Sequence, residues 1–117
     1  MRRPRLPTLR PHEVTRFWRS VDRPPFAGSC WTWTGHAITG GSGALYGEFR
    51  PSRAGRTLHV KAHRLAFYLT RGWFPEHFDV DHVCRNTLCV RPDHLEPVPH
   101  AENVRRARAA SRRPVSR

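Results

Sequence analysis

Three residues with metal-binding side chains fall within one short stretch of the sequence. Cys84, Cys89 and His94 follow one another at steps of five residues. Thiolate sulfur and imidazole nitrogen are common zinc ligands, and a structural zinc takes four ligands in a tetrahedron. The three side chains are close enough in sequence to converge on one ion. Cys30 is the only other cysteine, so the sequence predicts it as the fourth ligand.

A closed set of four ligands indicates a structural zinc, because a catalytic zinc keeps one coordination position open. The alternative is that the cysteines are small buried apolar residues, a common fate of free thiols. Disulfides explain them less well, since three thiols cannot all pair within one chain. We favour the zinc site because a small core gains much stability from a bound metal.

A second group of residues has the chemistry to hydrolyse a phosphate ester. Asp81 and His82 come just before the first loop cysteine, and Asn103 lies 21 residues after His82. Neutral imidazole, with a pKa of about 6.5, accepts a proton from water near neutral pH. The amide oxygen of Asn103 suits Mg²⁺, with Asp81 as a second oxygen ligand. Attack on phosphorus needs such a cation to stabilise the developing charge.

Three arginines are candidates for contacts to phosphate groups. Arg105 and Arg106 follow Asn103, and Arg64 lies earlier in the chain. Each can hold a phosphate through charge-assisted hydrogen bonds. Simpler roles exist for the neighbouring residues, since a histidine can bond a carbonyl, an aspartate can pair with an arginine and an asparagine can cap a helix. The catalytic interpretation therefore depends on their joint spacing around one loop.

The elements that must position these residues follow from the apolar pattern. The pattern predicts a strand over 78–83, a loop over 85–93, a second strand over 94–98 and a basic helix over 101–110. Ahead of this unit, a small antiparallel sheet and two helices are expected, which makes the fold class α+β. These earlier elements are a helix over 12–21, strands over 30–34, 44–50 and 57–61, and a helix from residue 62 to near Gly72.

The two ends of the chain differ in composition from its middle. Residues 1–11 carry arginines among prolines, and residues 111–117 are rich in arginine with little that is apolar. Neither composition can build a core. We therefore expect a flexible basic arm over 1–11, a single domain over 12–110 and a basic tail over 111–117.

The charge of the chain predicts a nucleic-acid partner. Lysine and arginine number 21 against 9 acidic residues, which gives a formal net charge of +12. Nearly all the positive charge is arginine, with Lys61 the only lysine. The planar guanidinium matches phosphate oxygens and guanine edges, although a GC-rich coding sequence would also favour arginine. A polyanion would neutralise this self-repulsion, so the charge as a whole favours nucleic acid.

A membrane partner is not expected from the sequence. No apolar run reaches the roughly 20 residues that a membrane span needs. No apolar signal-peptide core follows the N-terminus either. We therefore expect a cytoplasmic protein.

The run from Asp81 to Leu95, continuing to Asn103, resembles the HNH endonucleases of the His-Me finger superfamily. The likeness is greatest to the phage-type branch and to the His-Cys box homing endonucleases. It extends over Trp18, Cys30-Trp31-x-Trp33-x-Gly35, residues 62–66 and Asn103-x-x-Arg106. The resemblance implies a zinc-stapled ββα-metal (His-Me finger) motif over about residues 78–110.

The resemblance also assigns roles to individual positions. In that family the histidine at the position of His82 is the general base, and the asparagine at the position of Asn103 holds a catalytic Mg²⁺, for which Mn²⁺ is a candidate substitute. HNH members carry an acidic residue, placed like Asp81, that shares this ion. The structural zinc ligands of the His-Cys box enzymes match Cys30, Cys84, Cys89 and His94.

This sequence departs from the family pattern in two places. No cysteine follows Cys89, so the second zinc site and the C-terminal dimer tail of the His-Cys box enzymes are not carried over. A homodimer is therefore a partner that only the resemblance raises. Many phage relatives have Asn-Pro where this chain has Arg91-Pro92, so any hydrogen bond from that asparagine is lost.

Together these observations predict a metal-dependent DNA endonuclease acting on double-stranded DNA, with His82 as the base and Mg²⁺ as the cofactor. Two alternatives stay open, a non-catalytic zinc-stabilised DNA-binding module and an RNase or toxin-like nuclease. The resemblance implies a phage or prophage gene in a bacterial host cell. Homing, defence, and packaging beside phage packaging proteins all remain open as roles.

Overall fold

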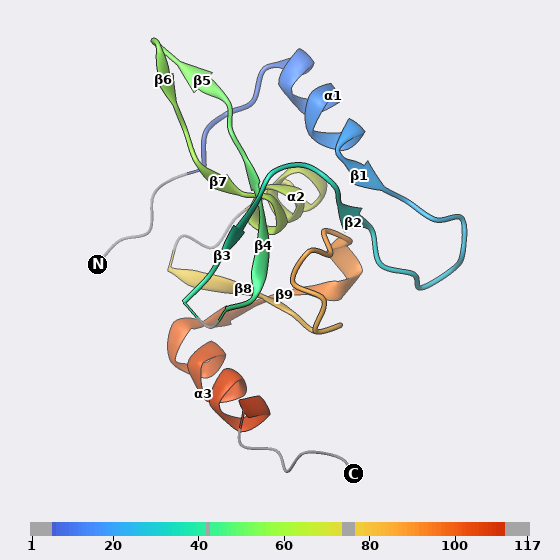
Figure 1. Cartoon of the computed structure of the whole chain (residues 1–117), viewed down its shortest axis with the longest axis vertical. Coiled ribbons are helices and arrows are strands. Elements are labelled where there is room, and N and C mark those ends of the chain that lie inside the picture. Colours follow the sequence, from blue (N-terminus) through green and yellow to red (C-terminus); the bar gives the residue numbers. More distant parts are fainter. Residues whose placement is uncertain (1–5, 42, 74–76, 112–117) are drawn as a thin grey trace.

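The computed structural model describes residues 6–41, 43–73 and 77–111, which form three α-helices and four small antiparallel sheets (Figure 1). This mixture of helices and antiparallel strands agrees with the predicted α+β class. The helices are α1 (Pro11–Arg19), α2 (Ala62–Arg71) and α3 (His100–Ser111), with one 3₁₀ turn, η1 (Pro92–His94). The sheets pair β1 (Val21–Asp22) with β2 (Thr32–Trp33), β4 (Leu45–Phe49) with both β3 (Ala37–Thr39) and β7 (Val60–Lys61), β5 (Ser52–Arg53) with β6 (Arg56–Thr57), and β8 (Phe78–His82) with β9 (Leu95–Pro99).

The first helix is held to the domain by one aromatic and one acidic residue. Phe17 of α1 is fully buried, with its ring centre 5.0 Å from that of Trp33. Glu13 pairs with Arg53 at 2.7 Å and accepts a hydrogen bond from the backbone N–H of Arg10 at 2.9 Å. The bond from Arg53 and then that from Arg10 lower the pKa of Glu13 to about 2. A buried carboxylate therefore ties α1 to the β5–β6 hairpin.

The described part of the N-terminal segment lies against this region. Leu6 and Leu9 pack on the main core, and the carbonyl of Thr8 accepts a hydrogen bond from Arg53 at 2.7 Å. Residues 6–10 belong to the segment predicted as a flexible arm. Their two leucines give them an apolar side, although residues 1–11 as a whole are rich in arginine and proline. Residues 1–5, and all of the predicted basic tail after residue 111, lie outside the described residues.

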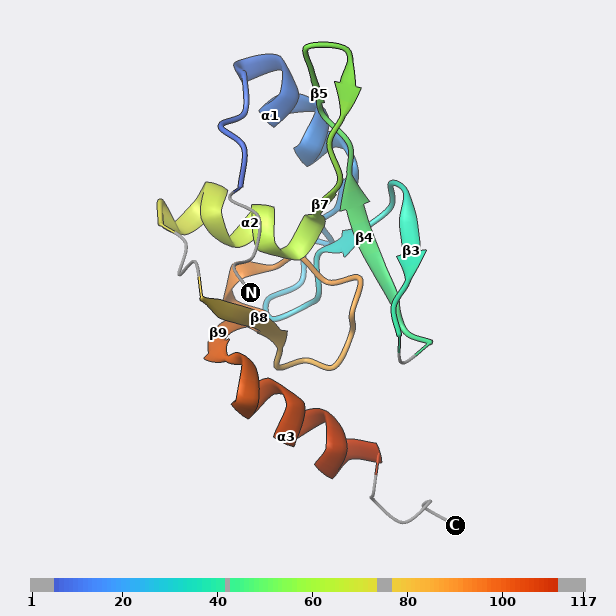
Figure 2. The same cartoon turned by 90° about the vertical axis from the view of Figure 1, so that its left-hand side faces the viewer.

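The second helix runs through the middle of the molecule, between α1 and the β8–β9 sheet (Figure 2). Leu65 packs in the main core, whereas Phe67 packs with Val80 of β8 and Leu95 of β9. The helix ends, as predicted, at Gly72, whose φ of 77° lies in the left-handed region that favours glycine. Among the described residues, no helix is long and apolar enough to cross a membrane.

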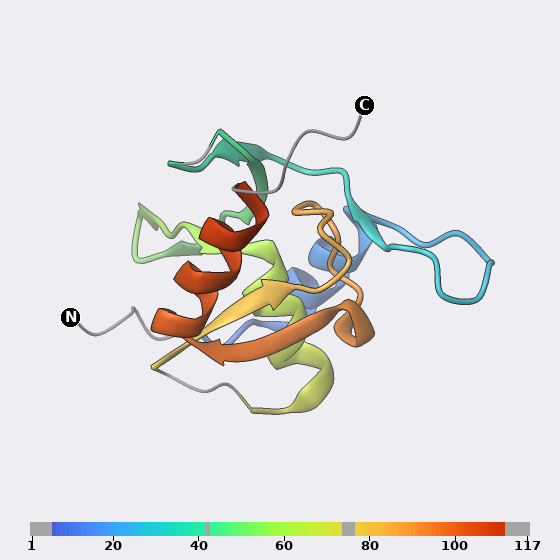
Figure 3. The same ribbon diagram turned by 90° about the horizontal axis from the view of Figure 1, so that it is seen from below.

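The strand, loop, strand, helix order predicted for residues 78–110 is observed, and each element boundary differs from its prediction by one residue at most. β8 and β9 pair antiparallel, with His82 opposite Leu95 at one end and Phe78 opposite Pro99 at the other. α3 follows directly and crosses both strands (Figure 3). The sheet therefore carries α2 on one face and α3 on the other.

The first half of the chain differs more from the predicted strands. The strand expected over 57–61 is split into β6 and β7, because the N–H of Leu58 turns to the carbonyl of Pro51. β3 was not predicted, and it exists because residues 37–39 pair with β4 across a glycine-containing turn. The strand expected over 30–34 is shortened, since the carbonyl of Trp31 accepts a hydrogen bond from the N–H of Val90, in the loop after β8.

Candidate functional site

The four predicted zinc ligands lie together. The ligand atoms of Cys30, Cys84, Cys89 and His94 are all within 4.8 Å of one another. Nδ1 of His94 is 3.5 Å from Sγ of Cys89 and 3.6 Å from Sγ of Cys30. Three thiols and one imidazole this close are a donor set that suits a tetrahedral structural zinc. Such an ion would join the segment before β2 to the loop after β8.

Backbone hydrogen bonds hold the same loop in place. The N–H of Trp33 donates to the carbonyl of Leu88 at 2.8 Å, and the N–H of Val90 donates to the carbonyl of Trp31 at 2.7 Å. These bonds fall on either side of Cys89, which is fully buried. The loop is therefore fixed immediately beyond the end of β8.

Arg91 stands where many phage relatives have an asparagine, and it makes a link of its own. Its guanidinium donates a hydrogen bond to the carbonyl of Ser29 at 3.0 Å and lies 5.5 Å from the ring centre of Trp31. Both partners flank Cys30 in the chain. Arg91 thus connects the loop after β8 to the segment around Cys30, in place of the bond that an asparagine at this position would make.

His82 ends β8 next to this loop, and its side chain is only 4% exposed. The ring is hydrogen-bonded to the backbone of Cys89, while Nε2 has no hydrogen-bond partner among the described residues. The bonded atom is therefore Nδ1, whose N–H donates to the Cys89 carbonyl, and Nε2 keeps its lone pair. Burial lowers the pKa of His82 to about 4, against the opposing effects of Asp81 and Cys89. Near neutral pH the imidazole is uncharged and able to accept a proton.

His82 lines a cavity of about 570 Å³ in the surface of the domain. The walls come from the β3–β4 hairpin, the first turn of α2, β8 and the start of α3. Asn103 is among the lining residues, so the fold brings the two main catalytic candidates to one space. The full lining is Gly40, Gly41, Tyr46, Lys61, His63, Arg64, Asp79, Val80, His82, His100, Asn103 and Val104.

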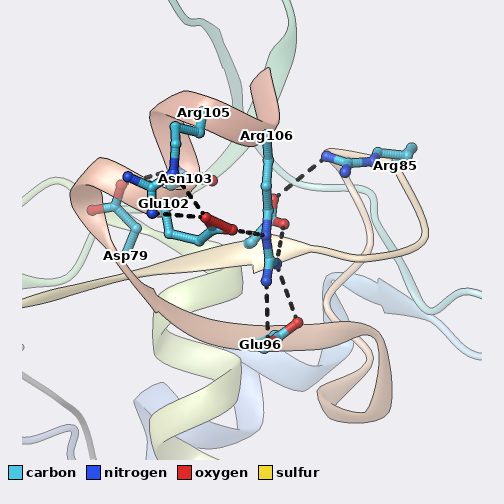
Figure 4. A network of polar contacts seen from close by, with 8 residues as sticks. Asp79, Arg85, Glu96, Glu102, Asn103, Arg105 and Arg106 are labelled. Atoms are coloured by element: carbon cyan, nitrogen blue, oxygen red, sulfur yellow. Dashed lines mark hydrogen bonds and ion pairs between the residues drawn. The ribbon is translucent and has the colours of Figure 1, made fainter. Parts of the chain in front are cut away.

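The carboxylate that lines this cavity is Asp79. Its Oδ2 accepts a hydrogen bond from Nδ2 of Asn103 at 2.8 Å (Figure 4). The same oxygen lies 2.9 Å from Nδ1 of His100. The side chain is buried, at 6% exposure. Because its amide nitrogen bonds Asp79, Asn103 is left with its amide oxygen as the atom that can bind a cation. A carboxylate and an amide oxygen are thus available side by side.

Asp81, the sequence-predicted ligand, is held by arginines instead. Its Oδ2 lies 3.0 Å from Nη1 of Arg106, and its Oδ1 lies 3.8 Å from Nη1 of Arg85. Arg106 also pairs with Glu96 and Glu102, both at 3.2 Å (Figure 4). These carboxylates, Glu96 first, raise the pKa of Arg106. The network fastens α3 to both strands, and Asp81 is not among the residues that line the cavity.

The three predicted phosphate-binding arginines therefore have different surroundings. Arg64 lines the cavity and is only 8% exposed. The side chain of Arg105 is 69% exposed and pairs with Glu102 at 2.9 Å. Arg106 is enclosed by the carboxylates described above. Of the two α3 arginines predicted to contact phosphate, Arg105 is the one open to solvent.

Sequence reasoning missed three of the cavity residues, Asp79, His63 and His100. A signal for Asp79 existed, because the two-residue period of a strand places it on the same face as Asp81. A signal for His63 also existed, since it opens a helix whose first residues are otherwise mostly apolar. The rings of His63 and His82 are 4.4 Å apart between centres. Burial lowers the pKa of His63 well below its ordinary value, so this ring is also neutral.

Comparisons with known proteins single out the same part of the chain. Residues 60–105 match the model of a family described as HNH endonuclease. That segment runs from β7 into α3 and includes most of the cavity residues. A protein of Enterobacteria phage T3, described as the uncharacterized gene 5.3 protein, is 30% identical over 53 residues, covering 45% of this chain. The matched part spans about half, 52%, of that relative. No solved structure matches the chain.

Proposed function

We propose that this chain, whose residues 60–105 match the model of the HNH endonuclease family, is a metal-dependent endonuclease that hydrolyses phosphodiester bonds of double-stranded DNA. The observation that supports this most strongly is that His82 and Asn103, 21 residues apart in sequence, line one cavity. The formal net charge of +12 suits a polyanionic substrate. The similarity to a protein of phage T3 agrees with a phage or prophage setting.

His82 acts in this proposal as the general base. Nε2 takes a proton from the attacking water, while the Nδ1–H bond to the Cys89 carbonyl fixes the ring and its tautomer. Because the zinc-ligand loop supplies that carbonyl, a structural zinc would hold the base still without touching the substrate. We assign the zinc this role and the β8, β9 and α3 elements to a ββα-metal motif.

A magnesium ion, when bound, supplies the positive charge that stabilises the phosphate and the leaving 3′ oxygen. The oxygen donors at the cavity fit Mg²⁺, which takes few protein ligands and keeps several waters, and Mn²⁺ suits the same donors. We propose that Asn103 and Asp79 hold it, because they contact each other at the cavity. Asp81 is the alternative carboxylate, and it would have to release Arg106 first.

The two aspartates form a matched pair for testing this assignment. We expect Asp79→Asn to weaken Mn²⁺ binding about 10-fold or more, because it removes a charged oxygen ligand. Asp81→Asn should leave Mn²⁺ affinity within about twofold and instead loosen α3, since it removes an anchor of Arg106. Calorimetric titration of the DNA-free protein with MnCl₂ measures the first effect, and thermal unfolding the second. The opposite ranking of the two variants in Mn²⁺ affinity would assign the ligand to Asp81.

Contacts to DNA are proposed for the arginines according to their exposure. Arg64 in the cavity can hold the phosphate that is cut, and Arg105 can contact a neighbouring phosphate from the open side of α3. Arg106, the third predicted contact, would have to leave its three carboxylates to do the same. Binding through phosphates should weaken steeply as salt is raised.

The proposal is tested by purified protein on supercoiled plasmid in MgCl₂ and in EDTA. Nicked product in Mg²⁺ alone supports the endonuclease. DNA binding in both buffers with no nicking in either would favour the alternative, a non-catalytic zinc-stabilised DNA-binding module. Parallel incubation with labelled RNA of similar length decides between a DNase and an RNase, since preferential RNA cleavage would exclude DNA as the main substrate.

A further inference from the structure

A second histidine, His63, lines the same cavity as the proposed base, His82. His63 is the second residue of α2 and is 5% exposed. The two ring centres are 4.4 Å apart, with an interplanar angle of 47°. The rings are thus close, but not stacked flat on one another.

The hydrogen bonds of His63 define which of its buried nitrogens is left as an acceptor. The ring is hydrogen-bonded to the backbone of Val80. This bond raises the pKa of His63, so the ring N–H is the donor and the Val80 carbonyl is the acceptor. Nδ1 has no hydrogen-bond partner among the described residues. Nε2–H is therefore the donor to the Val80 carbonyl, and Nδ1 carries a lone pair. His82 has the complementary tautomer, with Nδ1–H bonded to Cys89 and a lone pair on Nε2.

Two neighbouring imidazoles thus offer one cavity two acceptors and no donor. Leaving two buried acceptors unpaired costs free energy, so a small donor with two hydrogens is expected between them. A water molecule satisfies both at once by donating one O–H to each ring. Its oxygen lone pairs then point away from both rings.

We propose, resting on the proposed endonuclease function, that His63 orients the attacking water by accepting its second hydrogen bond while His82 accepts the first. In the reaction the water oxygen forms a bond to phosphorus, and one proton passes to Nε2 of His82. The bond from phosphorus to the 3′ oxygen breaks, and that oxygen leaves with the electron pair and takes a proton from solvent. The second proton of the water stays on the new phosphate oxygen, beside Nδ1 of His63.

Two amide substitutions separate this role from a purely structural one. In His63→Asn the amide oxygen takes the place of Nδ1, so the acceptor stays and the bond to Val80 is lost. In His63→Gln the amide nitrogen can still donate to the Val80 carbonyl, but the acceptor toward the water is gone. Water orientation predicts that Asn cuts plasmid within about 10-fold of wild type and that Gln loses about 10²-fold, with DNA affinity unchanged in both.

The melting temperature of each variant is measured beside its cleavage rate. If cleavage follows stability, so that Gln is the more active and more stable variant, His63 only supports β8 and the proposal is overturned. The histidine tautomers supply a test that needs no activity. Nitrogen-15 NMR of the zinc-loaded protein without magnesium should show Nε2–H for His63 and Nδ1–H for His82. A protein with these tautomers that never cuts DNA refutes the endonuclease, whereas Nδ1–H on His63 refutes only this inference.

Discussion

Replacing Cys89 with serine is expected to unfold the protein at room temperature. The substitution removes one of four ligands from a cluster that joins the segment before β2 to the loop after β8. Zinc binding contributes about 10 to 16 kcal/mol in small zinc-finger peptides. The net stability of an ordinary domain is of similar size, about 5 to 15 kcal/mol. Losing most of this contribution leaves a core of this size without enough burial to stay folded.

The measurement combines metal analysis with circular dichroism during heating. Wild type should contain one zinc per chain and unfold cooperatively, and it should lose that transition in a strong chelator and regain it when zinc is added back. Asp93→Asn is the matched control, because Asp93 lies beside His94 but its own side chain is 66% exposed. Its stability should change by less than about 1 kcal/mol. If wild type freed of metal kept an unchanged melting temperature, a structural role for zinc would be excluded.

That Cys30, Cys84, Cys89 and His94 lie together was predictable because three of them are nearly local in sequence. Three of the four ligands fall within 11 residues, so no knowledge of the tertiary fold is needed to bring them together. Cys30 followed only because no other cysteine exists. The strand, loop, strand, helix unit was predictable for a similar reason, since each element has a regular apolar period and its neighbours are adjacent in the chain.

The composition of the cavity could not be predicted in the same way. Choosing between Asp79 and Asp81 requires knowing which helix residue stands opposite each of them, and that depends on how α3 crosses β8. Here Asn103 lies against Asp79, while Arg106, one turn later, lies against Asp81. The resemblance to a family suggested Asp81 because it directly precedes His82. The packing of α3 on β8 is what places Asp79 beside Asn103 at the cavity.

The β3–β4 hairpin shows the same limit in the first half of the chain. β3 has three residues and little apolar period, so its strand conformation comes from pairing with β4 and not from its own sequence. Tyr46 of this hairpin nevertheless reaches the cavity, with its ring centre 5.9 Å from His63 and 6.1 Å from His82. Tertiary pairing therefore builds a wall of the site that local patterns do not reveal.

Replacing His82 with alanine should lower the rate of plasmid nicking by about 10² to 10⁴-fold, the usual contribution of a general base. DNA affinity should stay within about twofold of wild type, since a buried neutral imidazole makes little contribution to phosphate binding. Gel-shift titration in EDTA measures the affinity, and time courses in MgCl₂ measure the rate.

His82→Gln separates loss of the base from loss of packing, because glutamine fills much of the ring's volume but cannot accept a proton near neutral pH. Both variants should nick plasmid about 10² to 10⁴-fold more slowly than wild type. His12→Ala, which removes an exposed histidine of α1, should cut at the wild-type rate. Added imidazole should restore part of the activity of His82→Ala, whose vacated space adjoins the cavity, and little of that of His82→Gln. Full activity of His82→Gln would mean that His82 only packs beside the zinc-ligand loop and that the proton is taken by another group.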